Sequence, residues 1–171
     1  MHIQRPDNYV ISEITYFLKT MIVDDRNHTF VLDEYGAYNC PKSITRIIRS
    51  SCRTNGITIE RMKVQSKRFF TDRVHKQPLT LAYDNNLPVV FFPIYSARNN
   101  NNVWINCNAI INISHDGDGT LITFPNFYQI KLPVQHQAFS NLYSRAQFLQ
   151  KYLRKELPIN KNLANNPLLD I

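Results

Sequence analysis

The sequence predicts an α+β fold: an antiparallel β-sheet arranged as a meander, with barrel-like closure as an option, accompanied by two helical segments. Apolar and polar residues alternate through residues 103–114, as in a strand with one buried face. Apolar residues recur at steps of three and four at about residues 41–55 and 137–157, as in amphipathic helices. Short apolar runs separated by Asn, Asp and Gly fill much of the remainder, which is typical of hairpins.

The length of 171 residues and the hydrophobic content of 43% fit a single domain with one core. We expect this domain at residues 1–158, followed by a loosely ordered, asparagine-rich tail at residues 159–171. No apolar run approaches the ~18 residues that a membrane helix needs, and the first residues lack the pattern of a secretion signal. We therefore expect a cytoplasmic protein that does not engage membranes.

The opening third of the chain predicts two strands. Apolar and aromatic runs at residues 9–18 and 29–32 flank a polar turn at residues 24–27. A hairpin is the simplest structure that joins them.

A helix is expected at about residues 41–55, between Pro41, which suits a first helical position, and the stop signal Asn55-Gly56. Its apolar positions are Ile44, Ile47, Ile48 and Cys52. Four basic residues follow at steps of four, three and four along the opposite face: Lys42, Arg46, Arg49 and Arg53. Like charges at these spacings cost an isolated helix a few tenths of a kcal/mol, roughly, for each pair, and an external polyanion would remove that cost.

The next segment, residues 57–70, is basic and fits either a helix or a strand. Phe69 and Phe70 belong either to the core, which we favour, or to a set of exposed stacking groups.

Beyond Pro78 the chain is predicted to be β-rich until Pro133. The expected strands lie at residues 79–83 and 89–94 around a turn at 84–86, and at residues 103–114, 121–124 and 127–132, with turns at 116–119 and 125–126. The final amphipathic helix, at about residues 137–157, should pack its apolar stripe on the sheet and end at Pro158.

The sequence offers no catalytic, cofactor or metal site. Its four glycines form neither a P-loop nor a dinucleotide motif. The three cysteines show no CxxC spacing and are expected to be reduced thiols, with Cys52 buried on its helix. The Asp116-x-Asp118-Gly119 segment lacks the closing glutamate of a calcium loop and is better explained as a hairpin turn.

Basic residues are concentrated in one segment. The net charge is +7, and ten of the 20 lysines and arginines fall in residues 42–76, against Glu60 and Asp72, whereas residues 1–41 are net negative. Arginine outnumbers lysine in the basic segment, and guanidinium groups suit phosphate oxygens and narrow minor grooves. An ordinary solvated surface is the alternative, and nucleic-acid binding is favoured over it.

A loop of Arg98 followed by four asparagines is either a second contact, equipped for minor-groove acceptors, or an ordinary polar hairpin loop. With it, the candidate DNA-binding residues are Lys42, Arg46, Arg49, Arg53, Arg61, Lys63, Lys67, Arg68, His75, Lys76 and Arg98.

An ordered series of short motifs resembles the ComK competence transcription factor family over about residues 41–153. The motifs are Ser51-Cys52-Arg53-x-x-Gly56, His75-Lys76-x-Pro78, Phe91-Phe92-Pro93, Arg98 ahead of Val103-Trp104-Ile105, Leu132-Pro133, and Phe139-x-Asn141 with Arg145-Ala146. Basic or polar family positions are matched by Arg53, Arg61, Lys63, His75, Lys76 and Arg98. Two features depart from the family: Thr54-Asn55 replaces a usual aromatic pair, which speaks against an aromatic wedge there, and the C-terminal tail is short.

The resemblance implies a transcription activator that binds paired AT-rich boxes chiefly through the minor groove. It also implies homodimers that assemble into a tetramer on DNA, control by a proteolytic adaptor, and association with the bacterial nucleoid when bound. A diverged relative with altered targets is an alternative within the family.

Two other classes of function compete with duplex binding. A single-stranded RNA-binding module would use Tyr95, Trp104, Phe127 and Tyr128 as stacking platforms on a sheet. A non-enzymatic adaptor would use the basic face to bind an acidic protein partner.

Overall fold

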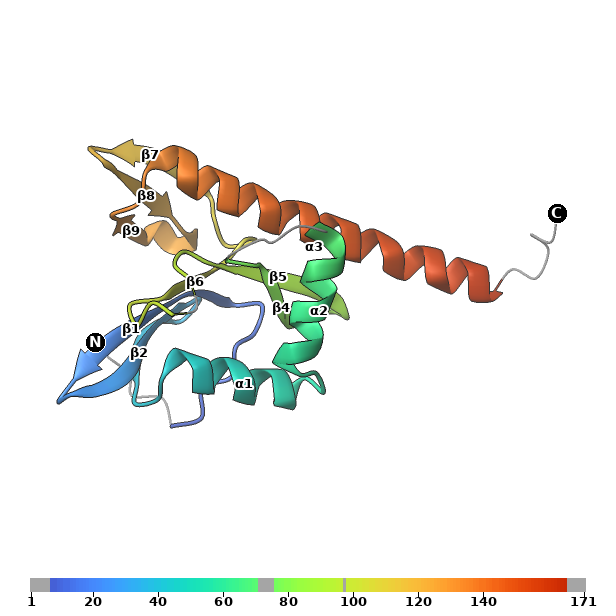
Figure 1. The fold of residues 1–171 in the computed structure, drawn as a ribbon, viewed down its shortest axis with the longest axis horizontal. Helices are drawn as coiled ribbons and strands as arrows, with labels where there is room; N and C mark the ends of the chain where they lie inside the picture. Colours follow the sequence, from blue (N-terminus) through green and yellow to red (C-terminus); the bar gives the residue numbers. More distant parts are fainter. Residues whose placement is uncertain (1–6, 71–75, 97, 166–171) are drawn as a thin grey trace.

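The computed structural model describes residues 7–70, 76–96 and 98–165, with side chains up to Lys155 (Figure 1). It contains a six-stranded sheet, a three-stranded sheet and three α-helices among these residues. The helices are α1 (Ile44–Thr54), α2 (Ile59–Phe70) and α3 (His136–Asn165), and a short 3-10 helix, η1, covers Pro125–Phe127.

The large sheet has the order β3-β2-β1-β6-β5-β4, and every neighbouring pair is antiparallel. Its strands are β1 (Thr15–Val23), β2 (Arg26–Asp33), β3 (Gly36–Cys40), β4 (Leu79–Asp84), β5 (Leu87–Pro93) and β6 (Val103–Asn106). The small sheet is the meander β7 (Asn112–Asp116), β8 (Gly119–Thr123) and β9 (Gln129–Leu132). The predicted α+β class is confirmed, and the strands described form no closed barrel.

Both faces of the large sheet are covered (Figure 1). On β5, Val89 and Phe91 point into a cluster with the buried faces of α1 and α2. The alternate residues Val90 and Phe92 point into a second cluster with α3 and the small sheet. The core is therefore two apolar layers separated by the sheet.

The segment at residues 103–114 is not one strand, so this prediction is wrong. The side-chain amide of Asn106 donates to the carbonyls of Glu13 (3.2 Å) and Thr15 (2.9 Å), and its Oδ1 accepts from the N–H of Asn108 (2.9 Å). These bonds turn the chain after β6, and the alternating pattern resumes in β7 of the other sheet. The predicted solvated face is also absent from β6, because all four of its residues are buried.

The N-terminal prediction is correct in outline. Strand β1 begins at Thr15 rather than residue 9, because Tyr9 instead packs its ring in the first cluster and hydrogen-bonds Thr15 and Asp33 through its hydroxyl. Strand β3 was not predicted. The turn between β1 and β2 is confirmed, with positive φ angles at Asp24 and Asp25.

Helix α1 agrees with the prediction except at its start. Ser43 is the N-cap and accepts from the N–H of Arg46 (3.4 Å), so Pro41 and Lys42 precede the helix. Gly56, at φ +70°, follows the last turn as expected. The ambiguous segment after it forms α2, and Phe69 and Phe70 are half-buried against the second cluster, which supports the core interpretation.

Helix α3 packs on the sheet as expected. Gln150 accepts from the N–H of Val90 (3.0 Å), and Arg154 donates to the carbonyl of Pro88 (3.0 Å). The helix continues to Asn165, so the prediction that it ends at Pro158 is wrong. A proline removes one intrahelical hydrogen bond and bends a helix without always ending it. Among the described helices none is long and apolar enough to span a membrane.

Candidate nucleic-acid interface

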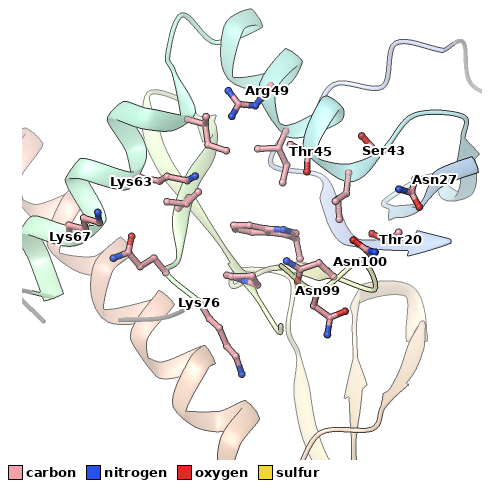
Figure 2. Close-up of a pocket in the computed structure, with 18 residues that line it drawn as sticks. Thr20, Asn27, Ser43, Thr45, Arg49, Lys63, Lys67, Lys76, Asn99 and Asn100 are labelled. Atoms are coloured by element: carbon pink, nitrogen blue, oxygen red, sulfur yellow. The ribbon is translucent and has the colours of Figure 1, made fainter. Parts of the chain in front are cut away.

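A cleft of about 460 Å³ opens between α1, α2 and the large sheet (Figure 2). Four cationic side chains line it: Arg49 from α1, Lys63 and Lys67 from α2, and Lys76 from the approach to β4. No carboxylate occurs among the described residues that line it. Like-signed charges in a concave site reinforce one another's field, so the cleft attracts anions.

The helical repeat aims these side chains at the cleft. In α2, Ile59, Met62 and Ser66 are buried, and Lys63 and Lys67 lie one turn apart on the flank that faces α1. Arg49 follows the buried Ile48 on α1. The two helices thus present their basic flanks to each other.

The floor of the cleft is apolar. It includes Ile44, Ile48 and Leu79, and the indole of Trp104, which is 9% exposed. An apolar floor carries few water molecules and lowers the local dielectric, which strengthens the attraction between the cations and a bound anion.

One wall of the cleft is formed by Asn99, Asn100 and Asn102 from the loop between β5 and β6, and these asparagines have two roles. The Oδ1 of Asn102 accepts from the N–H groups of Val103 (2.8 Å) and Tyr95 (3.3 Å), and the Oδ1 of Asn99 accepts from Asn101 (2.8 Å). These bonds shape a polar hairpin loop, in agreement with one of the two interpretations. Asn99 and Asn100 nevertheless line the cleft (Figure 2), while Arg98 is exposed on the same loop outside it.

Arg49 has a carboxylate partner. Its guanidinium lies 2.9 Å from Oε1 of Glu60 at the start of α2, and both side chains are about half exposed or more. The backbone N–H of Glu60 and the Arg49 guanidinium lower the pKa of the Glu60 carboxyl, so it is ionised at neutral pH. A phosphate that binds Arg49 must share it with Glu60.

A second hollow of about 730 Å³ adjoins the cleft and shares Asn27 and Ser43 with it. Arg26, Lys42 and Arg46 line it together with one carboxylate, that of Asp24. We call the cations of both hollows the basic track: Arg26, Lys42, Arg46, Arg49, Lys63, Lys67 and Lys76.

The track unites six of the residues predicted from sequence and leaves out four. Lys42 belongs to it from outside the helix, where its ammonium donates to Oδ1 of Asn8 (2.8 Å), so the predicted stripe of four on α1 is wrong in that position. The four described residues outside the track are Arg53 at the end of α1, Arg61 and Arg68 on the other flank of α2, and Arg98. His75 lies outside the described residues.

Sequence reasoning missed Arg26, Asn27 and Thr20, which line these hollows from the β1–β2 hairpin. Because the first 41 residues carry a net negative charge, Arg26 was not among the predicted DNA-binding residues. The signal that could have found it is the turn itself, because a hairpin next to the basic helix brings its tip residues into the same surface.

The four aromatic residues considered for RNA stacking do not share one surface. Trp104 packs in the first cluster with α1 and α2, whereas Tyr95 and Tyr128 pack against the second cluster on the opposite face. Phe127 is 93% exposed on η1. A continuous stacking platform on the sheet is therefore not formed by these rings.

The residues considered for other chemistry have structural roles. Cys40, Cys52 and Cys107 are buried free thiols, and burial raises the pKa of Cys107 to about 12. Asp116 and Gly119 close the β7–β8 hairpin, as predicted. Within the described part of the chain no three metal-ligating side chains gather into a site.

Neither the curated proteins nor the solved structures gave a match. The family model described as ComK protein matches residues 6–157, and the chain therefore belongs to the ComK family.

Proposed function

We propose that this protein is a transcription activator that binds AT-rich duplex DNA through the basic track, largely by phosphate and minor-groove contacts. Membership of the ComK family indicates a competence transcription regulator, in a family of transcription factors rather than enzymes. To this the proposal adds AT-rich duplex DNA as the ligand and the basic track as the surface that binds it.

The observation that carries the proposal is the charge of the track. Seven cations from α1, the segment before it, α2, the β1–β2 hairpin and the approach to β4 line two adjoining hollows whose described lining includes one carboxylate. Cations that neutralise backbone phosphates release counterions from DNA, which supplies much of the affinity. Together the two hollows offer a row of phosphate sites along one side of the molecule.

The amide loop supports recognition of AT-rich sequence. Asn100 lines the cleft and Arg98 is exposed on the same loop, next to the phosphate sites proposed on the track. Arginine favours the narrow minor groove of A-T tracts because the negative potential is greatest there. Amide groups can donate to the acceptors on the minor-groove edges of A-T pairs.

The remaining parts of the proposal come from family membership. The protein would act as a homodimer that assembles into a tetramer on paired boxes, associate with the nucleoid when bound, and be removed through a proteolytic adaptor. The basic track does not indicate which surface would contact a second subunit or a proteolytic adaptor.

The test is the salt dependence of binding to a fluorescent AT-rich duplex. Lys63→Ala with Lys67→Ala should weaken binding and flatten the slope of log K against log [salt] by about 2 units, close to one unit for each phosphate that the variant no longer neutralises. The matched control is Lys151→Ala with Lys155→Ala, two exposed lysines of α3 one turn apart and outside the track. An unchanged slope in the first pair, or an equal change in both pairs, contradicts the proposal.

A further inference from the structure

A third hollow, of about 800 Å³, lies between α2 and α3 on the flank of α2 away from the cleft. We propose that this α2–α3 hollow is a docking site for an acidic protein segment that carries apolar anchor side chains. The inference does not depend on the DNA-binding proposal, because none of the described residues that line this hollow belongs to the basic track.

The two basic flanks of α2 point in different directions. At ~100° per residue, Arg61 and Arg68 lie about 130° around the helix axis from Lys63 and Lys67. Arg61 and Arg68 line the hollow beside α3, whereas the two lysines line the cleft beside α1. A duplex that lies along the track leaves both arginines unused.

The chemistry of the hollow differs from that of the cleft. It contains arginine without lysine, and its described lining has no carboxylate. Val64 is 49% exposed and Tyr152 is 44% exposed, and Phe148, one turn earlier on α3, is 64% exposed. Protein interfaces are enriched in aromatic residues, methionine and arginine and depleted in lysine, which describes this surface and not the cleft.

The walls of the hollow are preformed. The ring of Phe69 lies 5.0 Å from that of Tyr152, centroid to centroid, and links α2 to α3. Leu153 and Met62, also in the lining, are buried in the two core clusters. A partner would therefore bind without ordering this surface first, which limits the entropy lost on binding.

Charge and apolar exposure together determine the occupant. The guanidinium groups of Arg61 and Arg68 can each bind a carboxylate through paired hydrogen bonds. The exposed side chains of Val64 and Phe148 need apolar partners, which a nucleic-acid backbone does not supply. An amphipathic acidic segment, with leucine or phenylalanine on its other face, satisfies both requirements.

The probe is a synthetic amphipathic peptide with glutamates on one face and leucine and phenylalanine on the other, titrated against the full chain by fluorescence anisotropy. Two control peptides carry lysine in place of glutamate, or serine in place of the apolar residues. We expect the acidic apolar peptide to bind at least tenfold more tightly than either control. Arg61→Ala with Arg68→Ala, and separately Val64→Ser, should weaken it about tenfold, while Lys63→Ala with Lys67→Ala should change it less than twofold.

Four outcomes overturn the proposal. If the acidic apolar peptide does not bind, the hollow is not a docking site for it. If the lysine pair weakens peptide binding as much as the arginine pair does, the binding reflects only general attraction between opposite charges. Loss of duplex binding in the arginine pair as large as in the lysine pair makes Arg61 and Arg68 DNA contacts. A change of oligomeric state in Val64→Ser, with peptide binding unaltered, makes the occupant a second copy of the chain. The DNA-binding proposal stands or falls separately, on the lysine pair and its duplex titration.

Discussion

On the side of α2 that faces α1, two lysines stand beside amide groups above a mostly buried tryptophan, whereas on the side that faces α3 two arginines stand beside exposed valine and tyrosine side chains. Both pairs come from the same basic segment of the sequence. The comparison teaches that a run of basic residues along the chain does not define one surface. The helical repeat places these residues on two flanks of α2, and the side chains next to each flank determine which ligand that flank suits.

The largest expected effect is on DNA binding. Lys63→Glu with Lys67→Glu should weaken duplex binding on the order of 100-fold at low salt, because two attractive charges become repulsive in a cleft whose described lining holds no carboxylate. Arg61→Glu with Arg68→Glu changes the net charge equally and should have an effect of about threefold or less. Similar losses in both variants, measured by band-shift titration, would show that the two flanks act as one.

The next effect tests whether DNA binding depends on α3, the helix that lines the α2–α3 hollow. Gln150→Ala removes the acceptor of the buried Val90 N–H and the donor to Asn108, 2.6 Å away. An unsatisfied buried N–H costs about 1–3 kcal/mol. Urea denaturation, monitored by circular dichroism, should therefore show a decrease of that size in the free energy of unfolding. Since no described residue of α3 lines the cleft, duplex affinity should stay within about twofold. A matching loss of duplex affinity would show that α3 supports both sites.

A smaller effect concerns the ion pair at the edge of the cleft. Glu60→Gln removes the carboxylate that competes with phosphate for Arg49. Exposed pairs of this kind are weak because solvent screens them, so duplex binding should tighten by only about two- to fivefold. Arg49→Ala should weaken binding and should abolish the effect of Glu60→Gln in the double variant. An additive result in that double-mutant cycle contradicts the competition.

An effect of similar size concerns sequence preference. Arg98→Ala, or Asn100→Ala, should reduce the ratio of affinities for AT-rich and GC-rich duplexes by about two- to fivefold, because the loop adds minor-groove contacts beside the phosphate sites. Total affinity should fall much less than in the lysine pair. A uniform loss across all duplexes would instead assign both residues to phosphate contact.

Much of the fold could be predicted from local signals. Gly56 marks the end of α1, paired positive-φ residues at Asn85 and Asn86 form the predicted turn between β4 and β5, and the isoleucines of α1 reveal its buried face. Each of these depends on residues a few positions apart, so the sequence pattern records it directly.

The features that could not be predicted depend on distant contacts. Asn106 ends β6 through bonds to residues more than 90 positions earlier, which no local pattern reveals. The division of α2 depends on which flank packs against α1 and which against α3. Arg26 joins the track only because the β1–β2 hairpin lies next to α1. The charge of the segment could be read from the sequence, but its division between two surfaces could not.

The central claim is that DNA lies on one flank of α2 alone, and two adjacent exposed residues test it most directly. A photo-crosslinking side chain introduced at Lys67, which lines the cleft, should form a covalent link to a bound AT-rich duplex under light. The same group at Arg68, one residue later on the flank beside α3, should not. Crosslinks of equal yield at both positions, or at Arg68 alone, would contradict the account.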